Sequence, residues 1–142
     1  MDEGSIEKMK KSICLALLAL MMIACGCGGE ASSSEGSKGT FRQVTPDEGK
    51  KMMEESSGYI IVDVRTQKEY AAGHIPKAIC IPNESIDKTP PAELADKNQE
   101  IFVYCRSGRR SKEAAQKLAN MGYTNIVEFG GIISWNGEVT KE

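Results

Sequence analysis

The sequence predicts an α/β domain in which a central, mainly parallel sheet is flanked by helices on both faces. Short apolar runs alternate along the chain with helical segments, which is the pattern of βα units. Two of these runs, residues 59–64 and 101–104, are β-branched or aromatic and nearly free of charge, as central strands of parallel sheets are. Such sheets place their sites beyond the carboxyl ends of the strands, and charged residues follow both runs here.

The composition predicts one globular domain with an amino-terminal appendage. The chain has 142 residues, of which 40% are hydrophobic and 27% charged, enough for a single core. We assign this core to residues 40–142 and expect the domain to be monomeric. The net charge of −2 argues against a nucleic-acid partner.

Residues 1–24 have the pattern of an export signal. A lysine-rich stretch precedes an apolar run from Ile13 to Ala24. This run is shorter than the about 20 residues that span a bilayer, and it suits a signal peptide. Acidic residues before Met9 are unusual in such a region, which indicates that the first eight residues are a misassigned start.

Residues 22–25, Met-Ile-Ala-Cys, resemble the cleavage box of a bacterial lipoprotein signal, in which the cysteine is lipidated after cleavage. Cys25 is a better candidate than Cys27, which has another cysteine two places before it; the alternative is that neither is processed. Residues 25–39 are rich in Gly and Ser and predict a flexible linker. We therefore expect an exported domain that a lipid on Cys25 holds at the extracytoplasmic side of a bacterial membrane.

The domain is predicted to begin with a helix from Pro46 to about Glu55. Thr45 is the expected N-cap, Pro46 occupies the first helical position, and Glu48 completes a capping box. A strand over residues 59–64 follows this helix.

A second, short strand is predicted over residues 78–82. Cys80 within it is expected to be a small core hydrophobe. A redox partnership between Cys80 and Cys105 is the alternative, but a cysteine in the middle of a strand is poorly placed to approach a loop. With one histidine and scattered cysteines, the chain offers no cluster of metal ligands, so we expect neither metal nor cofactor.

The second half of the domain repeats the alternation. Residues 86–95 are predicted to be a connection with a short helix after its prolines. A buried strand over residues 101–104 precedes a helix over residues 111–121, which Gly122 ends at its C′ position. The last strand is expected over residues 125–129.

The strand-to-helix turn carries the candidate nucleophile, Cys105. Free backbone N–H groups of a tight loop and of the first helical turn converge there, with the positive end of the helix dipole. Arg106, Arg109 and Arg110 strengthen the same field. Because this field favours a thiolate, we expect Cys105 to be far more reactive than an ordinary cysteine. The alternative is an inert core cysteine, which three neighbouring guanidinium groups do not suit.

Residues 105–110, Cys-Arg-Ser-Gly-Arg-Arg, resemble the six-residue active-site loop of single-domain rhodaneses, which are sulfurtransferases. Residues 59–79 resemble the amino-terminal signature of that family, with Lys77 where the family usually has a glycine. Residues 130–135, Gly-Gly-Ile-Ile-Ser-Trp, resemble its carboxy-terminal signature. The three motifs follow the family's order, and the resemblance covers about residues 40–142.

The resemblance implies that Cys105 takes a sulfane sulfur from an anionic donor such as thiosulfate and becomes a persulfide. Cyanide or a thiol would then accept the sulfur. The substrate-binding loop would consist of Arg106, Ser107, Gly108, Arg109 and Arg110, which attract the donor and stabilise the departing anion.

Two other functions remain open. The first is a phosphatase or arsenate reductase of the Cys-x5-Arg type, although the spacing from Cys105 to Arg110 is one residue shorter. The second is a non-catalytic or sensory module that only binds a partner, against which the retained cysteine and cationic loop argue.

The other residues of the signatures are expected to be structural. Asp63 and Arg65 end a strand and should hold neighbouring loops, with Glu69 as the partner of Arg65. His74 is expected to belong to a structural turn, and a role as the base of a Cys-His dyad is the weaker alternative. Trp135 is expected to pack.

Overall fold

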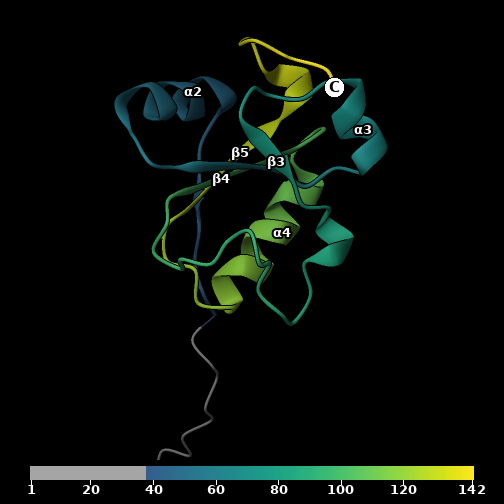
Figure 1. Cartoon of the computed structure of the whole chain (residues 1–142). Helices are drawn as coiled ribbons and strands as arrows, with labels where there is room; N and C mark the ends of the chain where they lie inside the picture. The colour runs from purple at the N-terminus through teal and green to yellow at the C-terminus, as the bar shows by residue number, and fades with distance from the viewer. Residues whose placement is uncertain (1–37) are drawn as a thin grey trace, which may run out of the picture. The chain divides into compact units, whose positions relative to one another are not determined.

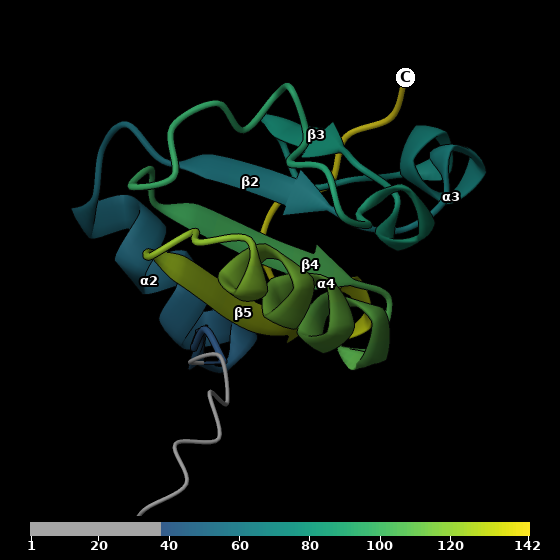
Figure 2. The same cartoon turned by 90° about the horizontal axis from the view of Figure 1, so that it is seen from below.

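The computed structural model describes residues 38–142, which form a five-stranded parallel sheet with helices on both faces (Figures 1 and 2). The predicted α/β class is confirmed. The strand order is β1-β5-β4-β2-β3. The strands are β1 (Arg42–Gln43), β2 (Ile60–Asp63), β3 (Ala78–Cys80), β4 (Ile101–Cys105) and β5 (Ile126–Gly131). The helices are α2 (Pro46–Glu55), α3 (Gln67–Ala72) and α4 (Arg109–Asn120), with 3₁₀ turns η1 (Asn83–Ser85) and η2 (Ile132–Ser134).

The strand β4 lies in the middle of the sheet and is buried along its whole length. It pairs with β2 on one side, where Asp63 lies opposite Tyr104, and with β5 on the other. The register with β5 shifts between Val103 and Cys105, so that Cys105 lies opposite Gly131. Since all of these strands are parallel, Cys105 and Asp63 end at the same edge of the sheet.

Successive residues of a strand face opposite sides of the sheet, and they divide the core into two layers. The α4-side core contains Val62, Val103, Cys105, Ala114 and Leu118. The α2-side core contains Met53, Tyr70, Phe102, Tyr104 and Phe129. Figure 1 shows α4 and α2 on opposite sides of the strands. Burying one large apolar side chain contributes about 1.5–3 kcal/mol, so each layer fixes its helix against the sheet.

The predicted caps of α2 and α4 are confirmed. Thr45 Oγ accepts a hydrogen bond from the Glu48 N–H, and the Glu48 carboxylate accepts one from the Thr45 N–H at 2.8 Å. The helix α4 begins two residues earlier than predicted, after Gly108 as N-cap. At its other end Gly122 has a φ of +95°, as a C′ glycine does.

Three local predictions need correction. No helix follows the prolines in residues 86–95, and the 3₁₀ turn η1 precedes them. Leu94 after the prolines is buried, and its carbonyl accepts a hydrogen bond from the Tyr123 hydroxyl at 2.6 Å. Such a short segment cannot sustain a helix on its own. The strand β3 stops at Cys80, and the sequence prediction missed β1 and α3 altogether.

In the turn before β3, Lys77 stands where the family signature usually has a glycine. Lys77 has a φ of +67° and is the only residue other than glycine with a positive φ within residues 38–142. This left-handed conformation costs a residue with a Cβ about 1–2 kcal/mol. Lys77 therefore holds a backbone conformation that suits the glycine usual at this position.

The proposed signal peptide and Cys25 lie outside the described residues. Between residues 38 and 142, no helix is long and apolar enough to cross a membrane.

Candidate active site

Cys105 is the last residue of β4, and the chain after it turns back over its sulfur. The Gly108 N–H donates a hydrogen bond to Cys105 Sγ at 3.0 Å. Gly108 has a φ of +101°, a conformation that favours glycine, and α4 starts at the next residue. The sulfur therefore faces the backbone donors of the loop and of the first helical turn.

The surroundings of Cys105 act on its pKa in opposite directions. Burial raises the pKa of the thiol, because the charged form loses its water. Hydrogen bonds from the side chain and backbone of Ser111 and from the N–H groups of Gly108 and Ser107 outweigh burial, so the pKa lies below its usual value. The site thus stabilises a thiolate by directed donors, as a reactive cysteine requires.

The end of β5 makes room for the loop. A Cβ on Gly131 would lie 2.1 Å from the carbonyl oxygen of Arg106, so only glycine allows this approach. Two residues later, the Ile133 N–H donates to the same carbonyl at 3.3 Å. The Gly-Gly motif thereby fixes the position of the backbone next to Cys105.

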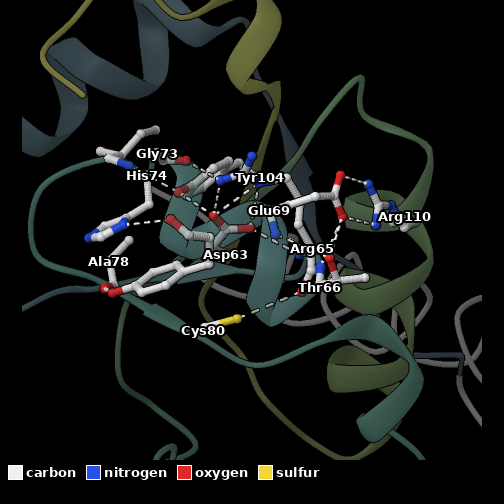
Figure 3. A network of polar contacts seen from close by, with 12 residues as sticks. Asp63, Arg65, Thr66, Glu69, Gly73, His74, Ala78, Cys80, Tyr104 and Arg110 are labelled. Carbon is white, nitrogen blue, oxygen red and sulfur yellow. Dashed lines mark hydrogen bonds and ion pairs between the residues drawn. The ribbon is translucent and has the colours of Figure 1, made fainter. Parts of the chain in front are cut away.

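The three arginines of the loop differ in their partners. Arg110 forms a bidentate pair with Glu69, with two N···O distances of 2.8 Å (Figure 3). The pKa of Glu69 falls to about 2, mainly because of the hydrogen bond from Arg110 and against the effect of burial. Arg109 is 80% exposed and reaches Glu113 only at 3.9 Å. Arg106 is also exposed and forms no ion pair with the described residues.

A buried network lies beside this pair (Figure 3). The Arg65 guanidinium donates to Asp63 at 2.6 Å and to the carbonyl of Gly73 at 2.6 Å. The Tyr104 hydroxyl donates to the same carboxylate at 2.7 Å. These contacts join the carboxyl ends of β2 and β4 to the turn around Gly73.

The expected partnership of Arg65 with Glu69 is wrong. Glu69 lies at the third position of α3, where its carboxylate accepts from the Thr66 N–H at 3.0 Å and completes a capping box. This position directs Glu69 toward Arg110, while Arg65 folds back on Asp63.

The family model described as rhodanese-like domain matches residues 45–138, which contain the loop and both signatures. The chain belongs to the rhodanese-like family.

Named relatives of this rhodanese-like domain include sulfurtransferases. Over 71 residues it is 37% identical to thiosulfate sulfurtransferase PspE of Escherichia coli, covering 50% of this chain and 68% of that protein. Over 97 residues it is 33% identical to thiosulfate sulfurtransferase GlpE of Haemophilus influenzae, covering 68% and 89%. It also matches putative sulfur carrier protein YrkF of Bacillus subtilis at 31% identity, but spans only 58% of that protein.

A solved structure supports the same fold. The rhodanese-like domain protein from Staphylococcus aureus is 33% identical, with a TM-score of 0.61, and covers 72% of this chain and 99% of that one. The family to which this domain belongs therefore includes named thiosulfate sulfurtransferases.

His74 and Trp135 of the rhodanese-like domain lie in packing positions. The His74 ring stacks on Tyr70 with centroids 3.7 Å apart, and its Nδ1 lies 2.9 Å from the Tyr70 carbonyl oxygen. Trp135 lies against Phe129 at 5.6 Å, and its Nε1 donates to the carbonyl of Glu138. The hydrogen bonds of both rings thus go to backbone carbonyls away from the Cys105 loop.

The other candidates for redox or metal chemistry lie apart from Cys105. Cys80 packs against the α2-side core, whereas Cys105 belongs to the α4-side core, and both thiols are free. Burial, followed by the charge of Asp63, raises the pKa of Cys80 to about 11. Among residues 38–142, no three His, Cys, Asp or Glu side chains are grouped to hold a metal ion.

The sequence prediction missed two residues of the site. Ser111 was assigned only to a helix, yet its hydroxyl lies at the loop, 3.0 Å from the Gly108 carbonyl oxygen. Glu128 was taken as part of a strand, yet its carboxylate lies 2.6 Å from Ser111 Oγ. The sequence signal for Glu128 was its position as a single acidic residue inside the apolar run 126–129.

Proposed function

We propose that the rhodanese-like domain transfers sulfane sulfur through a persulfide on Cys105. The thiolate attacks the outer sulfur of thiosulfate, the sulfur–sulfur bond breaks, and sulfite leaves with the bonding electrons. A thiol or cyanide then attacks the outer sulfur of the persulfide, which restores the thiolate. The observation that carries this proposal is the convergence of loop donors on Cys105 Sγ, which lowers its pKa.

The charges around the loop support an anionic donor. Arg106 and Arg109 are exposed residues of the loop and can attract a small anion. The N–H groups of Ser107, Gly108 and Ser111 face the sulfur and can stabilise the persulfide anion. No cofactor enters these steps.

The geometry of Arg110 favours sulfur transfer over phosphate chemistry. In a phosphatase of the Cys-x5-Arg type, the arginine guanidinium must be free to bind the substrate oxyanion with two hydrogen bonds. In this domain Glu69 already occupies that guanidinium with two hydrogen bonds.

Intact-mass analysis tests the proposal. After incubation with thiosulfate, the protein should gain one sulfur atom on the Cys105 peptide, and cyanide should remove it as thiocyanate. Cys105→Ser should abolish both steps, whereas the matched control Cys80→Ser should keep them. Phosphate release that depends on Cys105, without a cyanide-labile adduct, would assign a phosphatase instead. With neither chemistry, the domain would be a binding module.

We also propose that a lipid on Cys25 attaches the domain to a bacterial membrane. The support is the lysine-rich start, the apolar run and the Met-Ile-Ala-Cys sequence at residues 22–25. In a bacterial host, Cys25→Ser should move the protein from the detergent phase to the aqueous phase, and Cys27→Ser should not. Equal partitioning of Cys25→Ser and the parent protein would exclude this anchor.

A further inference from the structure

Arg110 ends the Cys105 loop, but its guanidinium is already paired. It lies in the first turn of α4, whose N-cap Gly108 donates its N–H to Cys105 Sγ at 3.0 Å. Its Nη1 and Nη2 atoms each donate to one oxygen of Glu69 at 2.8 Å. With such a pair of donors a guanidinium binds a carboxylate or a phosphate. Glu69 therefore occupies the donors that an oxyanion at the loop would need.

Glu69 is held in place from its own side of the pair (Figure 3). Its Oε2 accepts hydrogen bonds from the Thr66 N–H and from Thr66 Oγ, both at 3.0 Å, in the capping box of α3. The helix α3 is fixed in turn by Tyr70, which is buried and donates to the Ala78 carbonyl at 2.6 Å. The carboxylate therefore determines where the Arg110 guanidinium lies.

The other charges near the loop do not replace this pair. Among residues 38–142, Arg106 forms no ion pair, and Arg109 reaches Glu113 only at 3.9 Å. Both arginines are exposed, whereas the Arg110 side chain is 18% exposed and has a fixed geometry. The charge of Glu84 in η1 also acts on Arg110, but Glu84 is exposed and forms no ion pair with the described residues.

We propose that Glu69 is a specificity-determining residue, which withholds the Arg110 guanidinium from the Cys105 loop and so prevents tight binding of tetrahedral oxyanions such as phosphate and arsenate. Thiosulfate does not need this guanidinium, because the thiolate attacks its outer sulfur and the sulfonate group lies on the far side of that atom. Phosphate would have to place its own oxygens in the loop. This selection deepens the proposed function, and the step with thiosulfate rests on it.

Protection of Cys105 from alkylation tests the proposal on the full chain, with inorganic phosphate as the probe. The midpoint pH of Cys105 alkylation by iodoacetamide is first measured for each variant, so that protection is compared at the same thiolate fraction. Glu69→Gln removes the charge and keeps a residue that can complete a capping box. It should lower the phosphate concentration that halves the alkylation rate by about tenfold, because the freed guanidinium adds a charge-assisted contact.

A double-mutant cycle with Arg110→Ala identifies the source of this gain. In the parent, Arg110→Ala should change the half-protective phosphate concentration by less than about twofold, because the guanidinium is already paired. In the Glu69→Gln background, Arg110→Ala should reverse the gain. No gain in Glu69→Gln, or a loss of protection when Arg110→Ala is made in the parent, would overturn the proposal.

Glu113→Gln and Glu93→Gln are the matched controls, because they remove the same charge at exposed residues. Glu113 neighbours Arg109, so its variant reports the effect of charge near the loop without releasing Arg110. Both controls should leave the half-protective concentration unchanged. If Glu113→Gln gave the same gain as Glu69→Gln, net charge rather than the pair would set phosphate binding, and the proposal would fail.

A measurement on the unmodified chain covers the case in which Glu69→Gln fails to fold. In a phosphate titration followed by ¹⁵N NMR, the Nε signal of Arg110 should stay in place even where the amide signals of Ser107 and Gly108 shift. An Arg110 signal that shifts together with these amides would overturn the proposal. Neither experiment uses sulfur transfer, so failure of the proposed function would appear as missing sulfur loading with these results unchanged.

Discussion

Cys80 and Cys105 are each the last residue of a parallel strand, yet the pKa values of their thiols shift in opposite directions. The pKa of Cys80 lies above the usual value, and that of Cys105 lies below it. Burial raises the pKa of both. Cys105 is followed by a loop that returns to its sulfur with hydrogen-bond donors. The thiol of Cys80 instead lies 3.7 Å from the carbonyl oxygen of Arg65, near the charge of Asp63 (Figure 3). The chain after the strand, rather than burial or the strand end, therefore decides which thiol has the lowered pKa.

The largest expected effect is the difference in alkylation between the two thiols. With a pKa of about 11, Cys80 has a thiolate fraction of about one in a thousand at pH 8. We expect iodoacetamide to label Cys105 near neutral pH and Cys80 only as the pH approaches 11. Peptide mapping after timed labelling measures both rates in one sample. Similar labelling rates of the two cysteines at pH 8 would contradict the expected difference between their pKa values.

Gly131→Ala should make Cys105 behave more like Cys80. The added Cβ would meet the carbonyl oxygen of Arg106 at 2.1 Å and displace the loop from the sulfur. A misplacement of about 1 Å can cost about 100-fold in rate, and we expect a loss of this order in sulfur loading. Gly58→Ala is the control for general destabilisation, because Gly58 has a positive φ that disfavours a Cβ but has no atom near its Cβ position. Equal losses in both variants would mean that general destabilisation, not the loop, is responsible.

The pair of Glu69 and Arg110 predicts how the loop responds to acid. The pKa of Glu69 in the fold, about 2, lies below its ordinary value of 4.5, so the native state holds the charged form more tightly than the unfolded chain does. The pair thus contributes its full stabilisation above pH 4.5, and this contribution disappears as the pH falls through about 2. Thermal unfolding followed by circular dichroism between pH 5 and pH 2 should show a smaller decline in Glu69→Gln than in the parent. In Glu93→Gln the decline should be unchanged.

The smallest effect concerns the turn that leads to Cys80. Lys77→Gly should relieve the left-handed backbone conformation and raise the free energy of unfolding by about 1 kcal/mol. Urea unfolding measures this change. The alkylation midpoint of Cys105 should stay the same, because the loop after β4 is not involved. A lower stability would show that contacts of the Lys77 side chain outweigh the backbone strain.

Elements that depend on local interactions could be predicted from the sequence alone. The cap of α2 uses Thr45 and Glu48, which are three residues apart, and the turn at Cys105 follows from an apolar strand, a glycine and a helix start. The same local signal was present for α3, where Thr66 and Glu69 form an identical capping box. The capping box was therefore enough to predict α3.

Partners from distant parts of the chain could not be predicted, because they depend on how the strands pair. Arg110 meets Glu69 across 41 residues, and Ser111 meets Glu128 across 17, because parallel pairing brings the ends of β2, β4 and β5 to one edge. A sequence pattern places a residue on a strand or helix, but it does not say which charged side chain lies opposite. The sequence therefore predicted the nucleophile and its loop, whereas the fold decided which arginine is neutralised and which carboxylate reaches the site.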